Sequence, residues 1–172
     1  LKSPMVTAVI PAHNEAERVP ATVTQTLPFV DRIIVVDDGS SDETRALLKL
    51  ITDPKLSVLR HRVNLGKGSA LKTGCAAADL LGADIIITLD ADGQHPPEHI
   101  PGILNLLTTS HLDVVFSVRQ GGDAMPLVRR LGNTTLNWLA STLFNLRLRD
   151  MWCGFRAFTR RGLSQITWDK RD

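Results

Sequence analysis

The stretch Ile85-Ile86-Ile87-Thr88-Leu89-Asp90-Ala91-Asp92-Gly93-Gln94-His95 decides how this chain is organised. Its first five residues form an apolar run, which predicts a buried strand. The run ends in two carboxylates two positions apart, and strand geometry points Asp90 and Asp92 to the same side. Like charges placed together repel unless a positive charge lies between them, and a divalent cation with oxygen ligands would supply it. A turn in which Asp and Gly supply the turn chemistry explains the same residues.

Apolar runs of the same kind lie on both sides of this stretch and alternate with helical patterns. We expect strands over residues 6–10, 32–36, 56–61, 85–89 and 113–118. We expect helices over residues 20–27, 41–51, 97–107 and 126–146, and a further helix that follows the glycine-rich turn 64–69 and ends near residue 81. This alternation predicts an α/β fold with a mostly parallel central sheet flanked by helices.

Composition limits the classes of protein to which the chain can belong. With 172 residues, 43% of them hydrophobic and 22% charged, it is long enough for one domain with a sizeable core. A net charge of +2 gives no general case for nucleic acid, and we expect no nucleic-acid partner. Aromatic residues make up 5% and Tyr is absent, which argues against a stacking platform for single strands.

The two cysteines have no metal-ligand spacing. Cys75 lies in an Ala-rich helical pattern that predicts core packing, and a reducing compartment is the default. We find no signal peptide and no apolar run long enough to span a bilayer. Because the sequence begins at Leu1 and stops soon after Trp168, we expect a longer protein with a further C-terminal part.

Carboxylates follow the expected ends of three strands. Glu15 comes after the first strand, Asp37 and Asp38 after the second, and Asp90 with Asp92 after the fourth. Open α/β sheets bind their ligands at the carboxyl ends of the strands. The three clusters therefore predict one shared site, although each loop could carry acids for solubility or as a helix cap.

Basic residues lie close to the same predicted edge. Lys67 stands in a glycine-rich turn whose spacing differs from that of a Walker loop, but the turn leads into a helix whose positive end suits phosphate. Arg119 follows the fifth strand and Arg129 lies on the next expected helix. Guanidinium groups bind phosphate well, but each of these residues also fits a solvated surface. A metal on two acids with arginines across a cleft would suit two separate phosphate groups.

Four segments together resemble the family 2 glycosyltransferases with the GT-A fold, a Rossmann-like architecture. They are Val9-Ile10-Pro11-Ala12-His13-Asn14-Glu15, Val35-Val36-Asp37-Asp38-Gly39-Ser40-Ser41-Asp42-Glu43-Thr44, Asn64-Leu65-Gly66-Lys67-Gly68 and Asp90-Ala91-Asp92-Gly93-Gln94-His95-Pro96-Pro97. Within that family the chain is similar to dolichyl-phosphate mannose synthases and related polyprenyl-phosphate glycosyltransferases. The resemblance implies one catalytic domain over residues 1–172, with a donor half to about residue 95 and an acceptor half after it. It also implies sugar transfer from a nucleotide diphosphate sugar to a lipid phosphate, with Mg²⁺ or Mn²⁺.

The resemblance assigns roles by position. The residues that fall where the family binds the nucleotide are Pro11, His13, Glu15 and Asp38, to which we add Lys67 and Asp90. The expected metal ligands are Asp90, Asp92 and Gln94, and the expected acceptor-phosphate residues are Arg119, Arg129 and Asn133. The catalytic residues we expect are Asp92, Arg119, Arg129 and Asp150, the last followed by Gly154-Phe155-Arg156. His13 stands where the family often has Tyr, and Asn133 stands where it usually has Ser.

The chemical class of the acceptor depends on whether the chain carries a general base. A lipid phosphate is already anionic, whereas a sugar hydroxyl needs a base to take its proton. Relatives that use hydroxyl acceptors typically carry a late Glu-Asp pair, and this chain has no Glu-Asp dipeptide. We therefore expect a polyprenyl phosphate acceptor, with a hydroxyl acceptor or a non-catalytic nucleotide-sugar binding module as alternatives. The resemblance implies GDP-mannose as the sugar donor, with UDP-glucose as the second choice. It also implies a cytoplasmic protein that is bound peripherally at the cytoplasmic face of a membrane.

Two further classes of protein would explain only some of these motifs. A nucleotidyltransferase normally has its glycine-rich phosphate loop directly after the first strand, where this chain has Pro11-Ala12-His13-Asn14-Glu15. A phosphoacceptor domain of the response-regulator kind would explain Asp37 and Asp38 but would leave the Asp90 motif and the arginines without a role.

Overall fold

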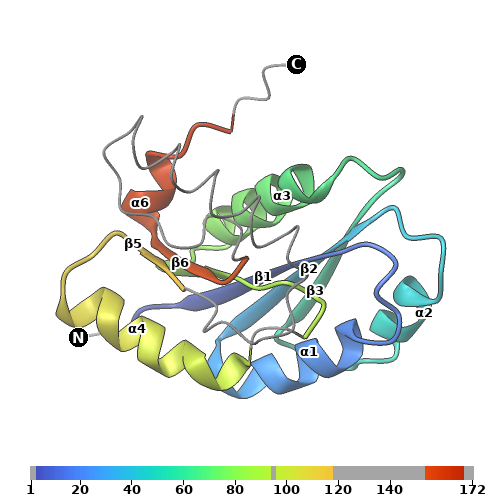
Figure 1. Cartoon of the computed structure of the whole chain (residues 1–172), viewed down its shortest axis with the longest axis horizontal. Helices are drawn as coiled ribbons and strands as arrows, with labels where there is room; N and C mark the ends of the chain where they lie inside the picture. Colours follow the sequence, from blue (N-terminus) through green and yellow to red (C-terminus); the bar gives the residue numbers. More distant parts are fainter. Residues whose placement is uncertain (1–2, 94–95, 118–153, 169–172) are drawn as a thin grey trace, which may run out of the picture. The chain divides into compact units, whose positions relative to one another are not determined.

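The computed structural model describes residues 3–93, 96–117 and 154–168 (Figure 1). The chain divides into two compact units, one formed by Leu1–Val115 with Phe155–Asp172 and the other by Phe116–Gly154. The helix expected over residues 126–146 lies outside the described residues, as do these site residues: Gln94, Arg119, Arg129, Asn133 and Asp150. The division into a donor half and an acceptor half stays a prediction.

The described residues form a six-stranded sheet with the order β3-β2-β1-β4-β6-β5. The strands are β1 (Val6–Ala12), β2 (Arg32–Asp38), β3 (Leu56–His61), β4 (Ile85–Thr88), β5 (Val114–Phe116) and β6 (Arg156–Thr159). β1 pairs in parallel with β2 and β4, β2 pairs in parallel with β3, and β6 runs antiparallel to β4. The predicted α/β fold with a mostly parallel sheet is confirmed.

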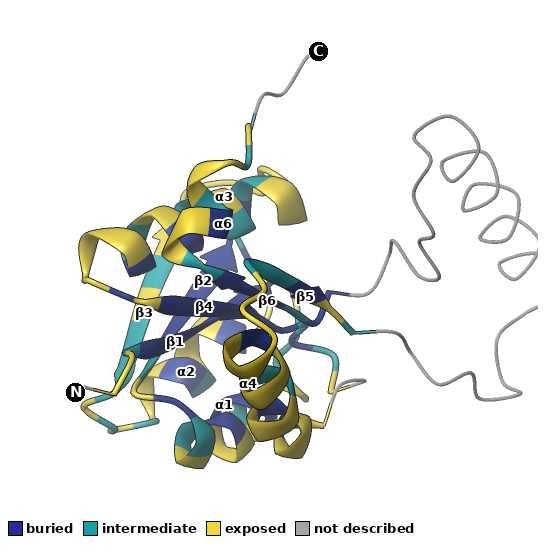
Figure 2. Cartoon of the chain, turned by 90° about the vertical axis from the view of Figure 1, so that its left-hand side faces the viewer, coloured by how far each residue is buried: buried dark blue, intermediate teal, exposed yellow. Residues whose placement is uncertain are grey.

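Helices cover both faces of this sheet, as Figures 1 and 2 show from two directions. The helical segments are α1 (Val19–Thr26), η1 (Leu27–Phe29), α2 (Thr44–Lys49), α3 (Lys67–Leu80), η2 (Pro97–His99), α4 (Ile100–Thr109) and α6 (Arg160–Ser164). α3 and α6 lie on one face, and α1, α2 and α4 lie on the other. Among the described residues, no helix has both the length and the apolar character needed to cross a membrane.

The central strands are buried because helices shield them from both sides. Every residue of β1 is buried, which accounts for a continuous apolar run in place of an alternating one. The core between α3 and the sheet includes Val9, Ile34 and, from α3 itself, Cys75. A Cβ on Gly74 would clash with Val9 Cγ1, so glycine at this position allows α3 to approach the sheet closely. Cys75 is buried as predicted, and burial raises the pKa of its thiol to about 12, which makes it unreactive.

β6 is the strand that the sequence analysis did not assign. It lies between β4 and β5, although more than 60 residues separate it from β4 in the chain. Its apolar side chains, Ala157 and Phe158, are buried, and its Thr159 N–H donates to the carbonyl of Asp113 at 2.9 Å. Thr159 Oγ1 also donates to the Asp113 carboxylate at 2.7 Å. A run of four residues carries too little periodicity to be predicted, and its position depends on distant partners.

Candidate functional site

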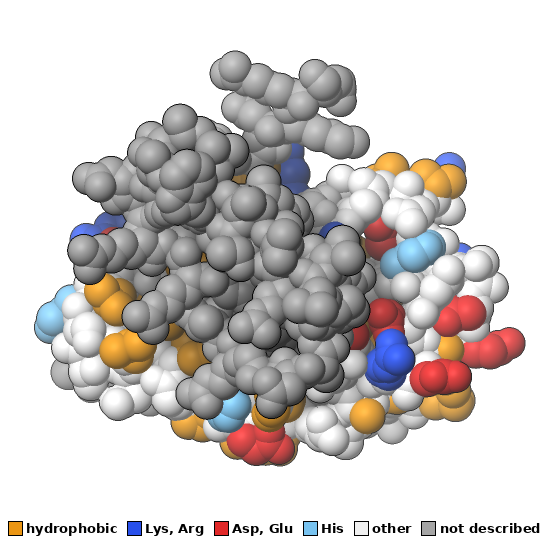
Figure 3. Space-filling view, viewed as in Figure 1, with side chains coloured by type: hydrophobic (Ala, Val, Ile, Leu, Met, Phe, Trp, Pro, Cys, Tyr) orange, Lys and Arg blue, Asp and Glu red, His pale blue; other side chains and the backbone are white. Residues whose placement is uncertain are grey.

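A pocket of about 320 Å³ lies at the carboxyl-terminal edge of β1, β2 and β4. Its lining residues are Pro11, Ala12, His13, Glu15, Asp38, Asn64, Gly66, Lys67, Ala70, Asp90, Ala91 and Asp92. The six residues predicted to bind nucleotide are all among them, together with Asp92. Figure 3 shows acidic side chains gathered with basic and histidine side chains on the right-hand part of the face seen there. The structure thus brings together four motifs that are far apart in the sequence.

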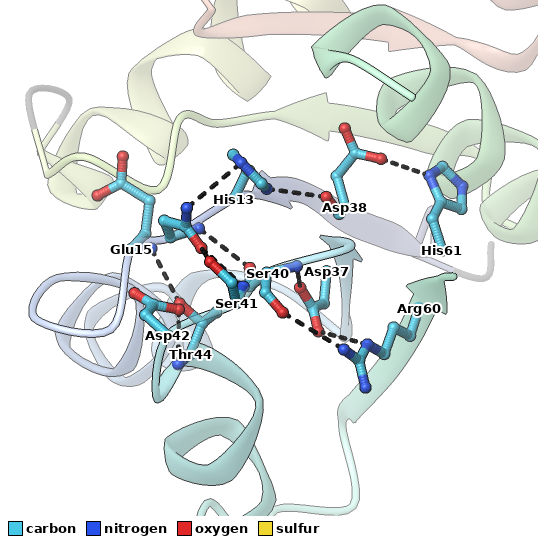
Figure 4. A network of polar contacts seen from close by, with 11 residues as sticks. His13, Glu15, Asp37, Asp38, Ser40, Ser41, Asp42, Thr44, Arg60 and His61 are labelled. Atoms are coloured by element: carbon cyan, nitrogen blue, oxygen red, sulfur yellow. Dashed lines mark hydrogen bonds and ion pairs between the residues drawn. The ribbon is translucent and has the colours of Figure 1, made fainter. Parts of the chain in front are cut away.

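The loop after β1 is tied to the loop after β2 by hydrogen bonds (Figure 4). The N–H of Asn14 donates to Ser40 Oγ at 3.0 Å, and Asn14 Oδ1 accepts from the N–H of Ser41 at 2.9 Å. Asn14 adopts a positive φ of 53°, a conformation that asparagine tolerates better than most residues. The N–H of Glu15 donates to Thr44 Oγ1 at 2.9 Å. These bonds fix the backbone that presents His13 and Glu15 to the pocket.

Asp37 and Asp38 are neighbours in sequence but have different roles. Asp37 is fully buried, and its Oδ1 accepts from the N–H of Ser40 at 2.9 Å. Its Oδ2 lies 3.3 Å from Arg60 Nε, an ion pair without hydrogen-bond alignment. Gly39 follows with a φ of +67°, and a Cβ there would lie 2.5 Å from the carbonyl carbon of Val63. Asp37 therefore holds the turn and is not a pocket residue, which argues against a phosphoacceptor role.

Asp38 faces the pocket, and its carboxylate is held from behind. Its Oδ1 accepts from His61 Nδ1 at 2.7 Å and from the N–H of Leu65 at 2.9 Å. Burial raises the pKa of Asp38, but hydrogen bonds from Leu65, His61 and Gly66 outweigh it, so the pKa lies below its usual value. Asp38 is an anion at neutral pH. Its backbone carbonyl also accepts from His13 Nδ1 at 2.8 Å, which links the ends of β1 and β2.

Lys67 and Asp90 form the charged part of the pocket. Lys67 begins α3 directly after Gly66, whose φ of 88° sets the turn into the helix. Lys67 Nζ lies 2.6 Å from Asp90 Oδ1, with side-chain exposures of 53% for the lysine and 13% for the aspartate. The loop after β4 is fixed by Thr22 Oγ1, which donates to the carbonyl of Ala91 at 3.2 Å. A lysine ammonium is therefore the counter-ion of Asp90 in this structure.

The charges of the pocket suit a divalent cation. Of its described lining residues, four are carboxylates, Glu15, Asp38, Asp90 and Asp92, and only Lys67 is a lysine or arginine. Within the described ranges, no group of three His, Cys, Asp or Glu residues is arranged to hold a metal ion. Two carboxylates with substrate phosphates are nevertheless a common way to bind Mg²⁺, and the oxygen donors of Asp90 and Asp92 fit this mode. An anionic ligand would also need a cation to enter so acidic a pocket.

The sequence matches the protein family described as glycosyl transferase family 2 over residues 7–167. The chain belongs to this family. It is 30% identical over 182 residues to a UDP-N-acetylglucosamine–dolichyl-phosphate N-acetylglucosaminyltransferase of Methanococcus voltae, covering 95% of this chain and 72% of that protein. It is 36% identical over 171 residues to an undecaprenyl-phosphate 4-deoxy-4-formamido-L-arabinose transferase of Pectobacterium carotovorum, covering 94% of this chain and 50% of that protein.

Solved structures also resemble this chain. One is glucosyl-3-phosphoglycerate synthase from Mycobacterium tuberculosis in complex with Mn²⁺, UDP-glucose and phosphoglyceric acid, with a TM-score of 0.72 and 25% identity. The match covers 92% of this chain and 58% of that one. The same enzyme bound to UDP alone also aligns with a TM-score of 0.72. The expected membership in family 2, its similarity to polyprenyl-phosphate glycosyltransferases and the GT-A type of fold are confirmed.

Sequence reasoning missed part of the site. It did not assign roles to Ala70, which lines the pocket one turn into α3, or to His61, which stands behind Asp38. The only signal in the sequence was that His61 ends the strand expected over residues 56–61, and the structure shows that it lies opposite Asp38 in the sheet register. The three expected acceptor-phosphate residues, Arg119, Arg129 and Asn133, and the expected catalytic residue Asp150 cannot be placed in this site, because they lie outside the described residues.

Proposed function

We propose that this chain is the catalytic domain of an inverting, metal-dependent glycosyltransferase that moves a sugar from a UDP-sugar to a polyprenyl phosphate. The observation that carries this proposal is the single pocket in which Asp38, Lys67, Asp90 and Asp92 meet at one edge of the sheet. β1 lies between β2 and β4, so Asp38 and Asp90 stand about two strand spacings apart, roughly 10 Å. That separation is comparable with the length of a nucleoside, which would place its base near Asp38 and its diphosphate near Asp90.

The nucleotide of the donor is proposed to be UDP. The resemblance of the sequence favoured GDP-mannose, with UDP-glucose as the second choice. The Methanococcus voltae relative is named for UDP-N-acetylglucosamine, and the Mycobacterium tuberculosis enzyme contains UDP-glucose. These names favour uridine over guanosine, and UDP-N-acetylglucosamine is the first donor to test.

The residues present define the proposed step. An oxygen of the acceptor phosphate attacks the anomeric carbon from the face opposite the diphosphate, and the bond to UDP breaks with its electron pair leaving on UDP. Asp90 and Asp92, with Gln94, would hold Mg²⁺ or Mn²⁺, which would neutralise the charge that develops on the diphosphate. Lys67, which lies against Asp90, would add a second positive charge beside that group.

The acceptor side rests on residues outside the described part of the chain. Arg119, Arg129 and Asn133 are proposed to bind the acceptor phosphate, since guanidinium groups bind phosphate in a bidentate manner. Because that phosphate is already ionised, no side chain has to remove a proton, and Asp150 would orient an arginine instead. An acceptor anchored in lipid would place the enzyme peripherally at the cytoplasmic face of a membrane.

The test combines donor binding with product formation. Purified protein is incubated with Mn²⁺ or Mg²⁺ and with UDP-N-acetylglucosamine, UDP-glucose or GDP-mannose, and thermal unfolding reports which donor stabilises the native state. A short polyprenyl phosphate is then added, and the glycolipid is detected by mass spectrometry. We expect stabilisation by UDP-sugars and a metal-dependent glycolipid product. If no nucleotide sugar raises the unfolding temperature in the presence of either metal, the proposed function is wrong.

A second candidate is transfer to a small, water-soluble acceptor that carries a hydroxyl group. The observation that favours it is the phosphoglyceric acid in the similar Mycobacterium tuberculosis structure. Phosphoglyceric acid therefore serves as a second acceptor in the same assay. Product with this acceptor and none with polyprenyl phosphate would replace the lipid acceptor but keep the donor site.

A further inference from the structure

We propose that His61 is a positioning residue that acts through Asp38 to select nucleotides whose base carries an imide or lactam N–H, as uracil and guanine do, over cytosine and adenine. This inference rests on the proposed function, since it assumes that a nucleotide binds with its base at Asp38. His61 is not among the residues that line the pocket, so it would not contact the base itself. Its effect would come from the position and charge that it imposes on the Asp38 carboxylate.

Two donors hold the same oxygen of Asp38. His61 Nδ1 lies 2.7 Å from Oδ1, and the N–H of Leu65 lies 2.9 Å from the same atom. Figure 4 shows the other carboxylate oxygen turned away from His61. Side-chain exposures are only 11% for His61 and 3% for Asp38, so water competes little for these bonds. The carboxylate is thus fixed in one orientation before any ligand arrives.

His61 is itself held in place from a third element. Its Nε2 lies 2.9 Å from Oγ1 of Thr73 on α3, and its backbone lies opposite Asp38 in the register of β2 and β3. Because an ionised carboxylate only accepts hydrogen bonds, Nδ1 of His61 must carry the proton that is shared with Asp38. The Thr73 hydroxyl is then the partner that keeps the ring from rotating. Sheet, helix and carboxylate together leave the imidazole a single orientation.

The charge of Asp38 decides which bases fit. Hydrogen bonds from Leu65, His61 and Gly66 outweigh the effect of burial and keep its pKa low, so the group offers only acceptors at neutral pH. Uracil presents N3–H and guanine presents N1–H and its amino group, and each can donate to a carboxylate. Cytosine N3 and adenine N1 are acceptors, so their lone pairs would face the anion. Sites that hydrogen-bond one ligand reject analogues that leave the buried group unpaired.

The experiment measures UDP and CDP affinity by titration calorimetry in the presence of Mn²⁺, using wild type and three variants at position 61. His61→Leu removes the donor, and His61→Gln moves the amide away from the Nδ1 position. His61→Asn places an amide N–H close to where Nδ1–H stands and should rescue the function. His99→Leu is the matched control, because His99 is an exposed histidine that does not line the pocket. Circular dichroism checks that each variant is folded.

We expect wild type, His99→Leu and His61→Asn to prefer UDP over CDP. His61→Leu and His61→Gln should lose UDP affinity by about tenfold to a hundredfold, the range for a lost hydrogen bond to a charged group. Their CDP affinity should change about twofold or less, so the UDP-to-CDP ratio collapses. A role that is only structural would lower both affinities together and leave the ratio unchanged.

Each result separates this inference from the proposed function. If wild type binds neither UDP nor CDP, the proposed function fails and the inference fails with it. If wild type prefers UDP and every folded variant at position 61 keeps the same ratio, the donor site stands and the role of His61 is overturned. Should His61→Leu fail to fold, the comparison of His61→Asn with His61→Gln decides, since a positioning role requires only the asparagine variant to keep the ratio.

Discussion

The two sides of the pocket are built in different ways. At the end of β2, Asp37 and Asp38 are nearly completely buried, and each has an oxygen fixed by a backbone N–H. In the loop after β4, Asp90 is paired with Lys67, whose side chain is 53% exposed and rotates more freely. The side at the end of β2, here the rigid side, is therefore preorganised for a group of fixed shape, whereas the side after β4, here the charged side, can exchange its positive partner.

This contrast agrees with the chemistry proposed for each side. A nucleobase has fixed donors and acceptors, and a rigid partner binds it at little entropic cost. A diphosphate with its metal changes charge during the reaction, so a counter-ion that can move is useful there. Substitutions on the rigid side and on the charged side should therefore have separate effects.

The largest effect should come from the charged side. We expect Asp92→Ala to lower the rate of sugar transfer by roughly a thousandfold, because metal stabilisation of the leaving group contributes several kcal/mol. The free energy of unfolding should stay close to that of wild type, since Asp92 lines a pocket and not the core. Transfer is measured by glycolipid formation, with Asp79→Ala as the control, because Asp79 is an exposed partner of Arg160. Wild-type activity in Asp92→Ala would remove it from the metal site.

The next effect should come from the rigid side and should appear in stability. We expect Asp37→Ala to lower the free energy of unfolding by about 1–3 kcal/mol, because the Ser40 N–H loses its buried acceptor. Asp90→Ala removes only a partly exposed ion pair and should cost about 1 kcal/mol or less. Both values come from urea unfolding. Equal losses for the two variants would contradict the proposed contrast between the two sides.

A smaller effect should appear in metal binding without nucleotide. Lys67→Met removes the ammonium that now lies against Asp90, so we expect Mn²⁺ to bind about twofold to fivefold more tightly, the worth of a partly exposed ion pair. Free Mn²⁺ is measured by electron paramagnetic resonance. Lys72→Met is the matched control, since Lys72 is exposed on the same helix and does not line the pocket. Unchanged or weaker Mn²⁺ binding in Lys67→Met would exclude competition between the lysine and the metal.

The smallest effect concerns acid pH. Since the folded-state pKa of Asp38 is lowered, its contribution to stability is complete above the pKa of the unfolded chain, about 3.9, and is lost as pH falls through the folded value. We therefore expect the stability difference between wild type and Asp38→Asn to shrink as the pH is lowered from 7 to 3. Urea unfolding across this range measures it. Some acid dependence should remain in the variant, because the pKa values of Asp42 and Asp113 are lowered too.

Much of the fold could be predicted from local pattern. The strand over Leu56–His61 begins and ends where the sequence analysis expected it, and β1, β2 and β4 differ from expectation by two residues or fewer. These runs are buried on both sides, so their apolar character is continuous and easily recognised. The motif residues at their ends followed from the rule that ligands bind at the carboxyl edge of such sheets.

Local sequence pattern therefore predicted most of the described strands and helices, with β6 and α6 as exceptions, and the group of strand-end residues that lines the pocket. Only the tertiary structure decided that β6 lies between β4 and β5, that Asp37 turns inward while Asp38 faces the pocket, and that His61 stands behind Asp38. Hydrophobic periodicity is a local property of the chain. Strand order and cross-strand partners depend on contacts between residues far apart in sequence, and a single sequence carries no direct record of those contacts.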